Sequence, residues 1–433
     1  MSQQYFYNGV IITLNEHDDI WERGSFLVDE KGKVVHVNEG PPPLDEPETM
    51  YIDLKGKWVL PGLINTHGHT GMTMLRGHAD DLPLEQWLQD KMWPIESRFT
   101  KEAVLASQSL AMVEMLKSGT TTFLDMYHLH LADMAEQVVK VGMRAVMTRG
   151  MIGLCSVAEQ KEKIQEAVHF ATEYRGADDG RVTTMLSPHA VYTCPPNFIE
   201  MVVNEAHRHS LPLHTHMSET AFEVEENERK YGKRPVAHLA DLGFFSTKSL
   251  VAHAVHVNEE EMELLHKHNV SVSYNPMSNL KLGSGIAPVA TMVEKGITVA
   301  FGTDSAASNN HLDLFEEMRT GILIQKGVQQ NSTVLPAKKA LQMATTNGAE
   351  ALGLQYVGQI KCGYEADFIT ICPDGPHFQP NNHIVSHLVY TASGRDVNDV
   401  YVKGKQLVKD KVCTTMDEEK IQFELNQQYN RLL

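Results

Sequence analysis

The stretch LPGLINTHGH (residues 60–69) joins a short apolar strand directly to two histidines. The same order, an apolar strand followed by polar or ionisable residues, recurs in seven further stretches: GTTTFLDMYH (119–128), MRAVMTRG (143–150), RVTTMLSPHAVYT (181–193), LPLHTHMSE (211–219), SLVAHAVHV (249–257), VSVSYNPMSN (270–279) and TVAFGTDSAASN (298–309). Amphipathic segments such as 101–118 and 157–174 separate these strands. Eight strands alternating with helices predict an α/β fold, a (β/α)8 barrel of TIM type over residues 61–360. An open, doubly wound sheet is the alternative, although no glycine-rich nucleotide motif opens a helix.

Both ends of the chain are rich in short strands and turns. FYNGVIITLN (6–15) shows this near the start, and YEADFITICPD (364–374) and VNDVYVKGKQLVKDKV (397–412) show it near the end. Alternating apolar residues with glycine-containing corners are typical of antiparallel strands. We therefore expect residues 1–60 and 361–433 to build one small, discontinuous β-sandwich domain beside the barrel.

The composition excludes several classes of protein. Of the 433 residues, 38 are Lys or Arg and 55 are Asp or Glu, so the net charge at pH 7 is −17. An acidic surface repels phosphate backbones, and we expect no nucleic-acid partner. No apolar run approaches the ~18 residues of a membrane span, and the start, MSQQYFYNGV, is unlike a signal peptide. The five cysteines form no CxxC pair, so we expect a cytoplasmic protein without a disulfide framework or a membrane partner.

The 22 histidines suggest a metal site. Residues two apart on a strand have their side chains on the same face. Each of the pairs His67/His69 and His214/His216 can therefore direct its imidazoles towards one metal ion. Asp304 follows the apolar run VAFG, where a carboxylate needs a partner. Three histidines and a carboxylate are a typical zinc ligand set. We interpret His214 as structural, and the other His-x-His pairs (128/130, 207/209 and 266/268) as loop, capping or surface residues.

Two further residues near these strand ends have the chemistry of acid–base catalysis. Glu219 follows His216 by three residues, where its carboxylate can reach a metal-activated water and carry a proton. Taken alone, Glu219 would be an ordinary glutamate in the first turn of a helix. His253 ends the sixth strand and can hydrogen-bond the same water or a substrate.

The motifs together resemble those of a known family. PGLINTHGHTGMTMLRG, WPIES, SGTTTFLDMY, SPHAVYTC, HTHMSET, NPMSNLKLGSGIAP and GTDSAASNN are similar to motifs of the amidohydrolase superfamily, and within it of the 5-methylthioadenosine/S-adenosylhomocysteine deaminases. The similarity runs through essentially the whole chain. It implies a metal-dependent barrel with a small β domain, usually in an oligomer, so we expect a homo-oligomer.

The resemblance also assigns roles by motif. It implies that His67, His69, His216 and Asp304 bind the metal, and that Glu219, His253 and Asp304 are catalytic, with Glu219 and Asp304 also touching substrate. Further substrate contacts are implied at Glu96 in WPIES, which matches the acid that holds the ribose hydroxyls, and at Arg149 and His189. From the residues alone, Glu96 would be an ordinary helix glutamate and Arg149 an ion-pair partner. The fourth strand has no lysine to bridge two metals, so we expect one divalent ion per subunit, zinc being favoured over iron or manganese.

The activity expected from this resemblance is hydrolytic deamination. A metal-activated water would convert 5′-methylthioadenosine, S-adenosylhomocysteine or both to the inosine analogue and ammonia. The alternatives are deamination of adenosine, 5′-deoxyadenosine or guanine, a reaction on an s-triazine ring, and a barrel that has lost catalysis and only binds. Two positions depart from the family's pattern. Gly68 stands between the first two histidines, where a threonine or alanine is more usual, and it spares the ligands themselves. Only Lys161 or Lys163 stands where some members carry a second arginine for a homocysteine carboxylate, which favours methylthioadenosine over S-adenosylhomocysteine.

Overall fold

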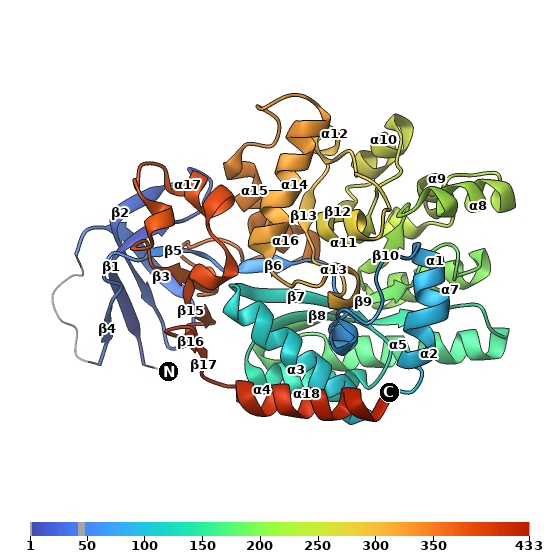
Figure 1. Cartoon of the computed structure of the whole chain (residues 1–433), viewed down its shortest axis with the longest axis horizontal. Helices are drawn as coiled ribbons and strands as arrows, with labels where there is room; N and C mark the ends of the chain where they lie inside the picture. Colours follow the sequence, from blue (N-terminus) through green and yellow to red (C-terminus); the bar gives the residue numbers. More distant parts are fainter. Residues whose placement is uncertain (1, 42–47, 433) are drawn as a thin grey trace.

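The structure is a computed structural model that describes residues 2–41 and 48–432. Eight parallel strands form one sheet in the order of the sequence (Figure 1). They are β6 (Leu63–Asn65), β7 (Thr120–Tyr127), β8 (Arg144–Met151), β9 (Val182–Pro188), β10 (Leu213–Met217), β11 (Ser249–His253), β12 (Ser271–Tyr274) and β13 (Val299–Phe301). The backbone N–H of Thr66 donates to the carbonyl of Phe301 (3.0 Å), and that of Asp304 donates to the carbonyl of His67 (3.0 Å). These bonds join the last strand to the first, so the prediction of a barrel is confirmed and the open sheet is wrong.

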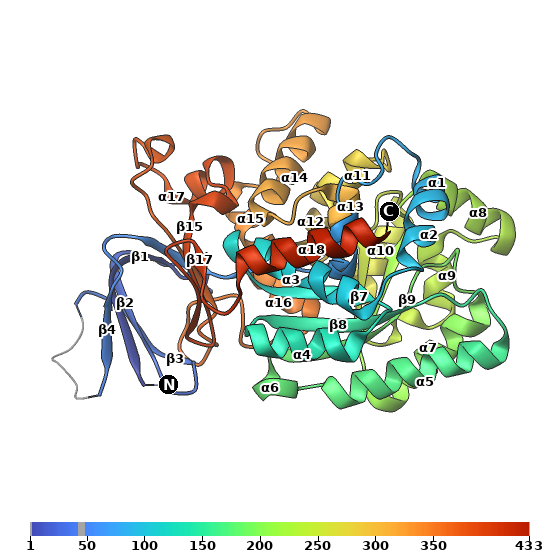
Figure 2. The same cartoon turned by 60° about the horizontal axis from the view of Figure 1, so that its bottom comes forward.

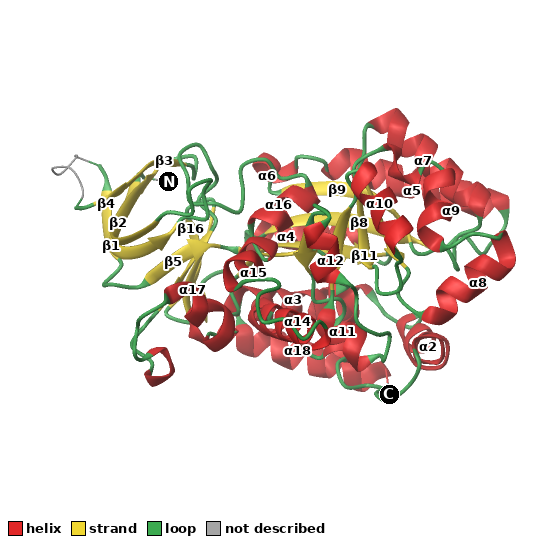
Figure 3. Cartoon of the chain, turned by 90° about the horizontal axis from the view of Figure 1, so that it is seen from above, coloured by secondary structure: helices red, strands yellow, loops and turns green. Residues whose placement is uncertain are grey.

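Helices surround the barrel strands, as Figure 3 shows from above. The principal ones are α3 (Lys101–Lys117), α4 (Leu131–Val141), α5 (Val157–Tyr174), α7 (Pro196–His209), α8 (Ala221–Tyr231), α9 (Pro235–Asp241), α10 (Glu259–Lys267), α12 (Val289–Glu294), α14 (Leu314–Val328), α15 (Ala337–Met343) and α16 (Thr346–Leu352). Within the described ranges, no helix combines the length and apolar character needed to cross a bilayer.

Alternate strand residues fill two different cores. In β7, Leu124 and Met126 belong to an apolar cluster that α16 also joins, whereas Phe123 and Tyr127 belong to the larger cluster that includes the outer helices. This division follows from the two-residue period of a strand, which sends successive side chains to opposite faces. Because the strands are parallel, their carboxyl ends lie at one rim of the barrel and present their side chains together.

The two ends of the chain form one mixed sheet. Its strands are β1 (Gln4–Ile12), β2 (Ile20–Val28), β3 (Val34–Glu39), β4 (Met50–Asp53), β5 (Trp58–Pro61), β14 (Phe368–Ile371), β15 (Val397–Val402), β16 (Lys405–Lys409) and β17 (Val412–Cys413). Phe6 and Phe368 pack edge to face with ring centroids 5.0 Å apart, so aromatic residues from both ends share one core. The α/β fold predicted from the sequence, with a β unit drawn from both termini, is confirmed.

The last helix lies apart from this sheet. Helix α18 (Glu418–Leu432) runs along α3 of the barrel (Figure 2), where Lys117 donates to Glu418 at 2.6 Å. The segment 361–433, which we assigned as a whole to the small domain, therefore ends in a helix that packs on the barrel.

A buried ion pair connects the small sheet to the barrel. Arg144, at the start of β8, donates from Nε to Oδ2 of Asp367 at 2.8 Å, and their side chains are 4% and 1% exposed. Replacing Arg144 by methionine leaves the Asp367 carboxylate buried without that cation, so we expect the free energy of unfolding to fall by ~3–5 kcal/mol. Urea unfolding followed by circular dichroism measures it.

The matched control is Arg229→Met. Arg229 pairs with Glu226 on the surface of α8, where the side chains are 70% and 36% exposed, and solvent screens the interaction. We expect its urea midpoint to equal that of the wild type. An Arg144→Met variant that unfolds at the wild-type midpoint would show that the buried pair does not stabilise the two units.

Candidate active site

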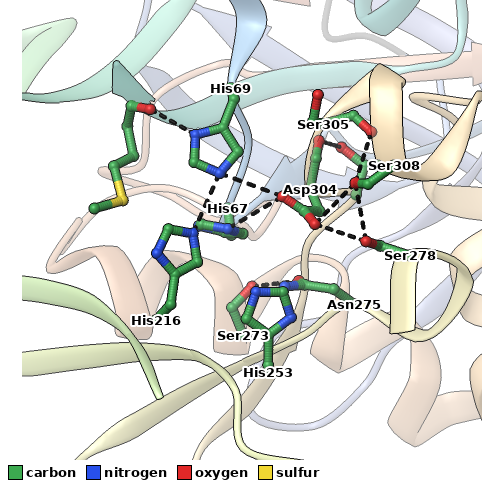
Figure 4. A network of polar contacts seen from close by, with 12 residues as sticks. His67, His69, His216, His253, Ser273, Asn275, Ser278, Asp304, Ser305 and Ser308 are labelled. Atoms are coloured by element: carbon green, nitrogen blue, oxygen red, sulfur yellow. Dashed lines mark hydrogen bonds and ion pairs between the residues drawn. The ribbon is translucent and has the colours of Figure 1, made fainter. Parts of the chain in front are cut away.

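The four proposed metal ligands lie together at the carboxyl rim of the barrel (Figure 4). His67 and His69 follow β6, His216 is in β10, and Asp304 follows β13. Oδ1 of Asp304 lies 3.4 Å from Nε2 of His67 and 3.3 Å from Nε2 of His69. Nε2 of His216 is 3.3 Å from Nε2 of His69. His67, His69 and Asp304 thus offer three atoms close enough together to hold one metal ion, and His216 adjoins this group through His69.

The Nδ1 atom of His67 is fixed by a second histidine. His214 Nδ1 faces the carbonyl oxygen of Leu250 at 2.9 Å, so it must donate there, and its Nε2 accepts from Nδ1 of His67 at 2.9 Å. The proton of His67 is therefore on Nδ1, and its Nε2 keeps a lone pair. We predicted a structural role for His214. A residue that hydrogen-bonds the second ring nitrogen of a metal-binding histidine is typical of metal sites, and His214 holds this position beside His67.

Backbone carbonyl groups fix the Nδ1 protons of His69 and His216. Nδ1 of His69 donates to the carbonyl of Met126 (2.6 Å), and Nδ1 of His216 donates to the carbonyl of His189 (2.8 Å). Burial, together with the neighbouring imidazoles, lowers the pKa of His216 well below its usual value. The neutral ring that results is the form that binds a metal.

The cluster fits a metal ion better than it fits a set of hydrogen bonds. Nε2 of His67 is buried and makes no hydrogen bond within the described part of the chain. Burial alone would raise the pKa of Asp304, but the contacts with His67 and His69 hold it well below its usual range. A buried carboxylate beside three imidazole nitrogens is a suitable set for zinc.

Asp304 is held in a strained conformation. Its φ is +60°, a left-handed backbone that only glycine adopts freely. Its Oδ2 accepts hydrogen bonds from Ser278 (2.6 Å) and Ser308 (2.9 Å), which leaves Oδ1 facing the histidines. Strain of this kind persists where surrounding contacts determine the geometry, and it is common at functional sites.

His253 presents a donor to the site. Its Nδ1 accepts from Nδ2 of Asn279 at 2.9 Å and of Asn275 at 3.3 Å, so its proton is on Nε2. Asn275 is oriented in turn because its Oδ1 accepts from Ser273 at 3.0 Å. Burial lowers the pKa of His253 to about 3, which keeps the ring neutral. Although this Nε2 lies near other ring nitrogens, an N–H cannot ligate a metal.

Glu219 faces the same point from the end of β10. Its Oε2 lies 3.6 Å from Nε2 of His253, and the residue is 4% exposed. Burial raises the pKa of Glu219 well above its usual value, and the nearby carboxylates add to the shift. A carboxyl group of this kind can take and release a proton near neutral pH.

A cavity of about 440 Å³ opens above these groups. Glu96, Arg149 and His189, the predicted substrate contacts, all line it, and Lys163 does so while Lys161 does not. Glu96 lies in α2 (Trp93–Glu96), and burial raises its pKa. The rest of the wall is largely apolar: Met72, Leu84, Trp87, Leu88, Trp93, Ile152 and Leu282.

Two polar groups on the wall are already engaged. Arg149 donates to Glu166 at 2.5 Å, and Lys163 donates to the carbonyl of Ile152 at 2.9 Å. Gly68 leaves room beside the ligands, because a Cβ there would meet no atom closer than 3.5 Å. An alanine would therefore fit at Gly68.

Sequence reasoning missed the residues that orient the site. Ser278, Ser308 and Asn279 are small polar residues within recognisable motifs, and nothing in their type or spacing distinguishes them from ordinary loop residues. Their importance follows only from hydrogen bonds to Asp304 and His253.

Comparison with known proteins identifies the family of this chain. The model of the amidohydrolase family matches residues 58–407. The chain belongs to the amidohydrolase family. Curated relatives in this family include proteins named 5-methylthioadenosine/S-adenosylhomocysteine deaminase. The one from Halalkalibacterium halodurans is 57% identical, covering 93% of this chain and 92% of the relative. The one from Shouchella clausii is 48% identical, covering 98% of each.

Solved structures of the amidohydrolase fold match along nearly the whole chain. An adenosine deaminase from Xanthomonas campestris with bound zinc superposes with a TM-score of 0.90 at 32% identity, covering 99% of this chain and 98% of that one. Atrazine chlorohydrolase from Arthrobacter aurescens TC1, complexed with zinc, gives a TM-score of 0.90 at 24% identity, covering 98% of this chain and 100% of that one. The second likeness shows the fold alone.

Removing the outer partner of His67 tests the metal site. We expect His214→Phe to weaken metal binding by about 10–100-fold, because His67 loses the acceptor that fixes its proton on Nδ1. Metal content after dialysis against graded chelator measures this. His238→Phe is the control, since His238 is also buried but bonds Asn227 (3.1 Å), which is not a proposed metal ligand. Retention of metal by His214→Phe at wild-type chelator concentrations would contradict the expectation.

Proposed function

We propose that this protein is a metal-dependent hydrolytic deaminase that converts 5′-methylthioadenosine, S-adenosylhomocysteine or both to the inosine analogue and ammonia. The observation that carries the proposal is the position of the buried Glu219 carboxylate, which lies 3.6 Å from His253 and lines the same largely apolar cavity as His69, His216 and Asp304. The names of the curated relatives support the substrate class.

His67, His69, His216 and Asp304 would hold the ion. When bound, a divalent metal lowers the pKa of a coordinated water towards ~7 and so supplies a nucleophile. Glu219 removes the proton of the attacking water and delivers it to ring N1, which lets the purine accept electrons as oxygen bonds to C6. His253 donates from Nε2 and orients the oxygen. The proton that remains on the added oxygen then moves to the amino group, the bond from C6 to that nitrogen breaks, and ammonia leaves as the C6 carbonyl forms.

The cavity wall would hold the remainder of the nucleoside. Glu96 is a buried carboxylate that can accept both ribose hydroxyls, and His189 and Arg149 line the same cavity as further polar contacts. His189 Nδ1 is bonded to the hydroxyl of Thr193 at 2.9 Å, which fixes its ring. The apolar side chains suit a thioether.

Other parts of the assignment are also proposals. We infer one zinc ion per subunit, on the strength of the donor set and the zinc-bound neighbour. A homo-oligomeric state, a cytoplasmic location and the absence of a nucleic-acid partner stay predictions from the sequence.

A substrate panel tests the activity directly. Zinc-loaded protein is mixed separately with 5′-methylthioadenosine, S-adenosylhomocysteine, adenosine and guanine, and the ultraviolet spectrum and ammonia release are followed. We expect the change from adenine to hypoxanthine with one or both thioether nucleosides, because the apolar wall suits the thioether sulfur that they share. Turnover of guanine alone, or of none of the three adenosine compounds, would overturn the proposed substrate class.

A single substitution tests the proton carrier. Glu219→Gln keeps the shape of the side chain but cannot accept a proton, so we expect kcat to fall by ~10²–10⁴-fold with metal content unchanged. Glu225→Gln, on the exposed face of α8, is the control and should keep wild-type kcat. Near-normal turnover by Glu219→Gln would exclude the proton-transfer role.

A further inference from the structure

A helix-capping sequence next to the site has an unusual set of partners. Helices α5 and α10 begin with capping boxes, in which Glu159 and Glu261 accept from the backbone N–H of their own N-cap residue. The stretch TAFE, from Thr220 to Glu223, has the same spacing at the start of α8. Thr220 caps the helix by accepting from the N–H of Glu223 at 3.1 Å.

The carboxylate of Glu223 reaches past this cap. Its Oε1 accepts from the backbone N–H of Ser218 at 2.8 Å, and its Oε2 accepts from the backbone N–H of Glu219 at 2.8 Å. Glu223 is 2% exposed. Both oxygens of this buried carboxylate therefore bind the turn that carries Glu219, the proposed proton carrier. Neither of these bonds caps helix α8, whose cap is Thr220.

That turn has an unfavourable backbone and is held from two sides. Ser218 has φ +52°, in the left-handed region. On the other side of the turn, the carbonyl of Met217 accepts from the N–H of Ala254 (3.0 Å), and the carbonyl of Ser218 accepts from the N–H of His256 (2.9 Å). The loop after β11 thus holds the carbonyl groups, and Glu223 holds the N–H groups.

We propose that Glu223 is a positioning residue for catalysis, which fixes the 218–219 turn so that the Glu219 carboxylate meets Nε2 of His253 and the reacting water. The inference rests on the proposed function for the role of Glu219. Misplacement of a catalytic group by about 1 Å costs about 10²-fold in rate. The other predicted substrate contacts, Glu96, Arg149 and His189, line the cavity outside this turn, so we expect the loss to fall mainly on kcat.

Glu223→Gln is the direct test, because its amide retains one acceptor but sets an N–H against a backbone N–H. We expect kcat to fall by about 10–10²-fold, with KM within about twofold of wild type and metal content unchanged. The matched control is Glu261→Gln, a glutamate at the same helix position that is 3% exposed and also accepts a backbone N–H (3.0 Å). Its kcat should equal that of the wild type.

Amide hydrogen exchange gives a second measurement that does not depend on the substrate. In Glu223→Gln we expect the Ser218 and Glu219 amides to exchange about tenfold faster, since one loses its acceptor and the other keeps only an amide oxygen on a displaced side chain. Glu261→Gln should leave those two amides unchanged. If Glu223→Gln does not fold, Glu223→Asp, which withdraws the carboxylate, is judged by the same criteria.

The outcomes separate this inference from the proposed function. If the wild type deaminates none of the nucleosides, the proposed function fails, while faster exchange at 218 and 219 still supports the anchoring role of Glu223. Unchanged exchange would overturn the inference. So would faster exchange with wild-type kcat, a loss confined to KM, or an equal fall of kcat in Glu261→Gln.

Discussion

Two backbone hydrogen bonds between the first and last barrel strands hold the site together. Thr66 donates to Phe301, and Asp304 donates to His67. The side chains beside them reinforce the connection, since Asn65 bonds Thr303 although 238 residues separate them in the chain. The second backbone bond joins two proposed metal ligands to each other directly. Closing the barrel and assembling half of the ligand set are therefore one event.

The site concentrates groups that would not remain together without outside support. Buried imidazoles and carboxylates lose their hydration, and Asp304 and His253 both have positive φ, +60° and +77°. Hydrogen bonds from Ser278 to Asp304 and from Asn279 to His253 offset part of this cost, because they fix which atom of each acceptor side chain faces the proposed metal site. Stability and function conflict locally at such sites, because a relaxed backbone would direct the same side chains elsewhere.

Much of the fold and of the ligand positions could be predicted, because simple periods govern them. Alternation of strands and helices predicted the barrel, and the apolar strand before them singled out His67 and His69, although both lie just past the end of β6. The positions of Glu96 and Arg149 on the wall came from resemblance alone, since their local patterns are ordinary. Ser278, Asn279 and Glu223 act through contacts that depend on how separate loops meet, which no local pattern encodes. The packing of α18 on α3 is unpredictable for the same reason.

The division of the small sheet between two distant segments has a consequence for synthesis. β5 lies in the middle of that sheet, with β1 on one side and β14 on the other. When β5 leaves the ribosome, about 300 residues must still be made before β14 appears, roughly 15–60 s at usual translation rates. Throughout that interval, a strand of buried residues, Trp58–Pro61, has an unpaired edge open to other chains. The nascent chain thus stays open to misassociation until β14, which follows the last barrel strand and α16, has been made.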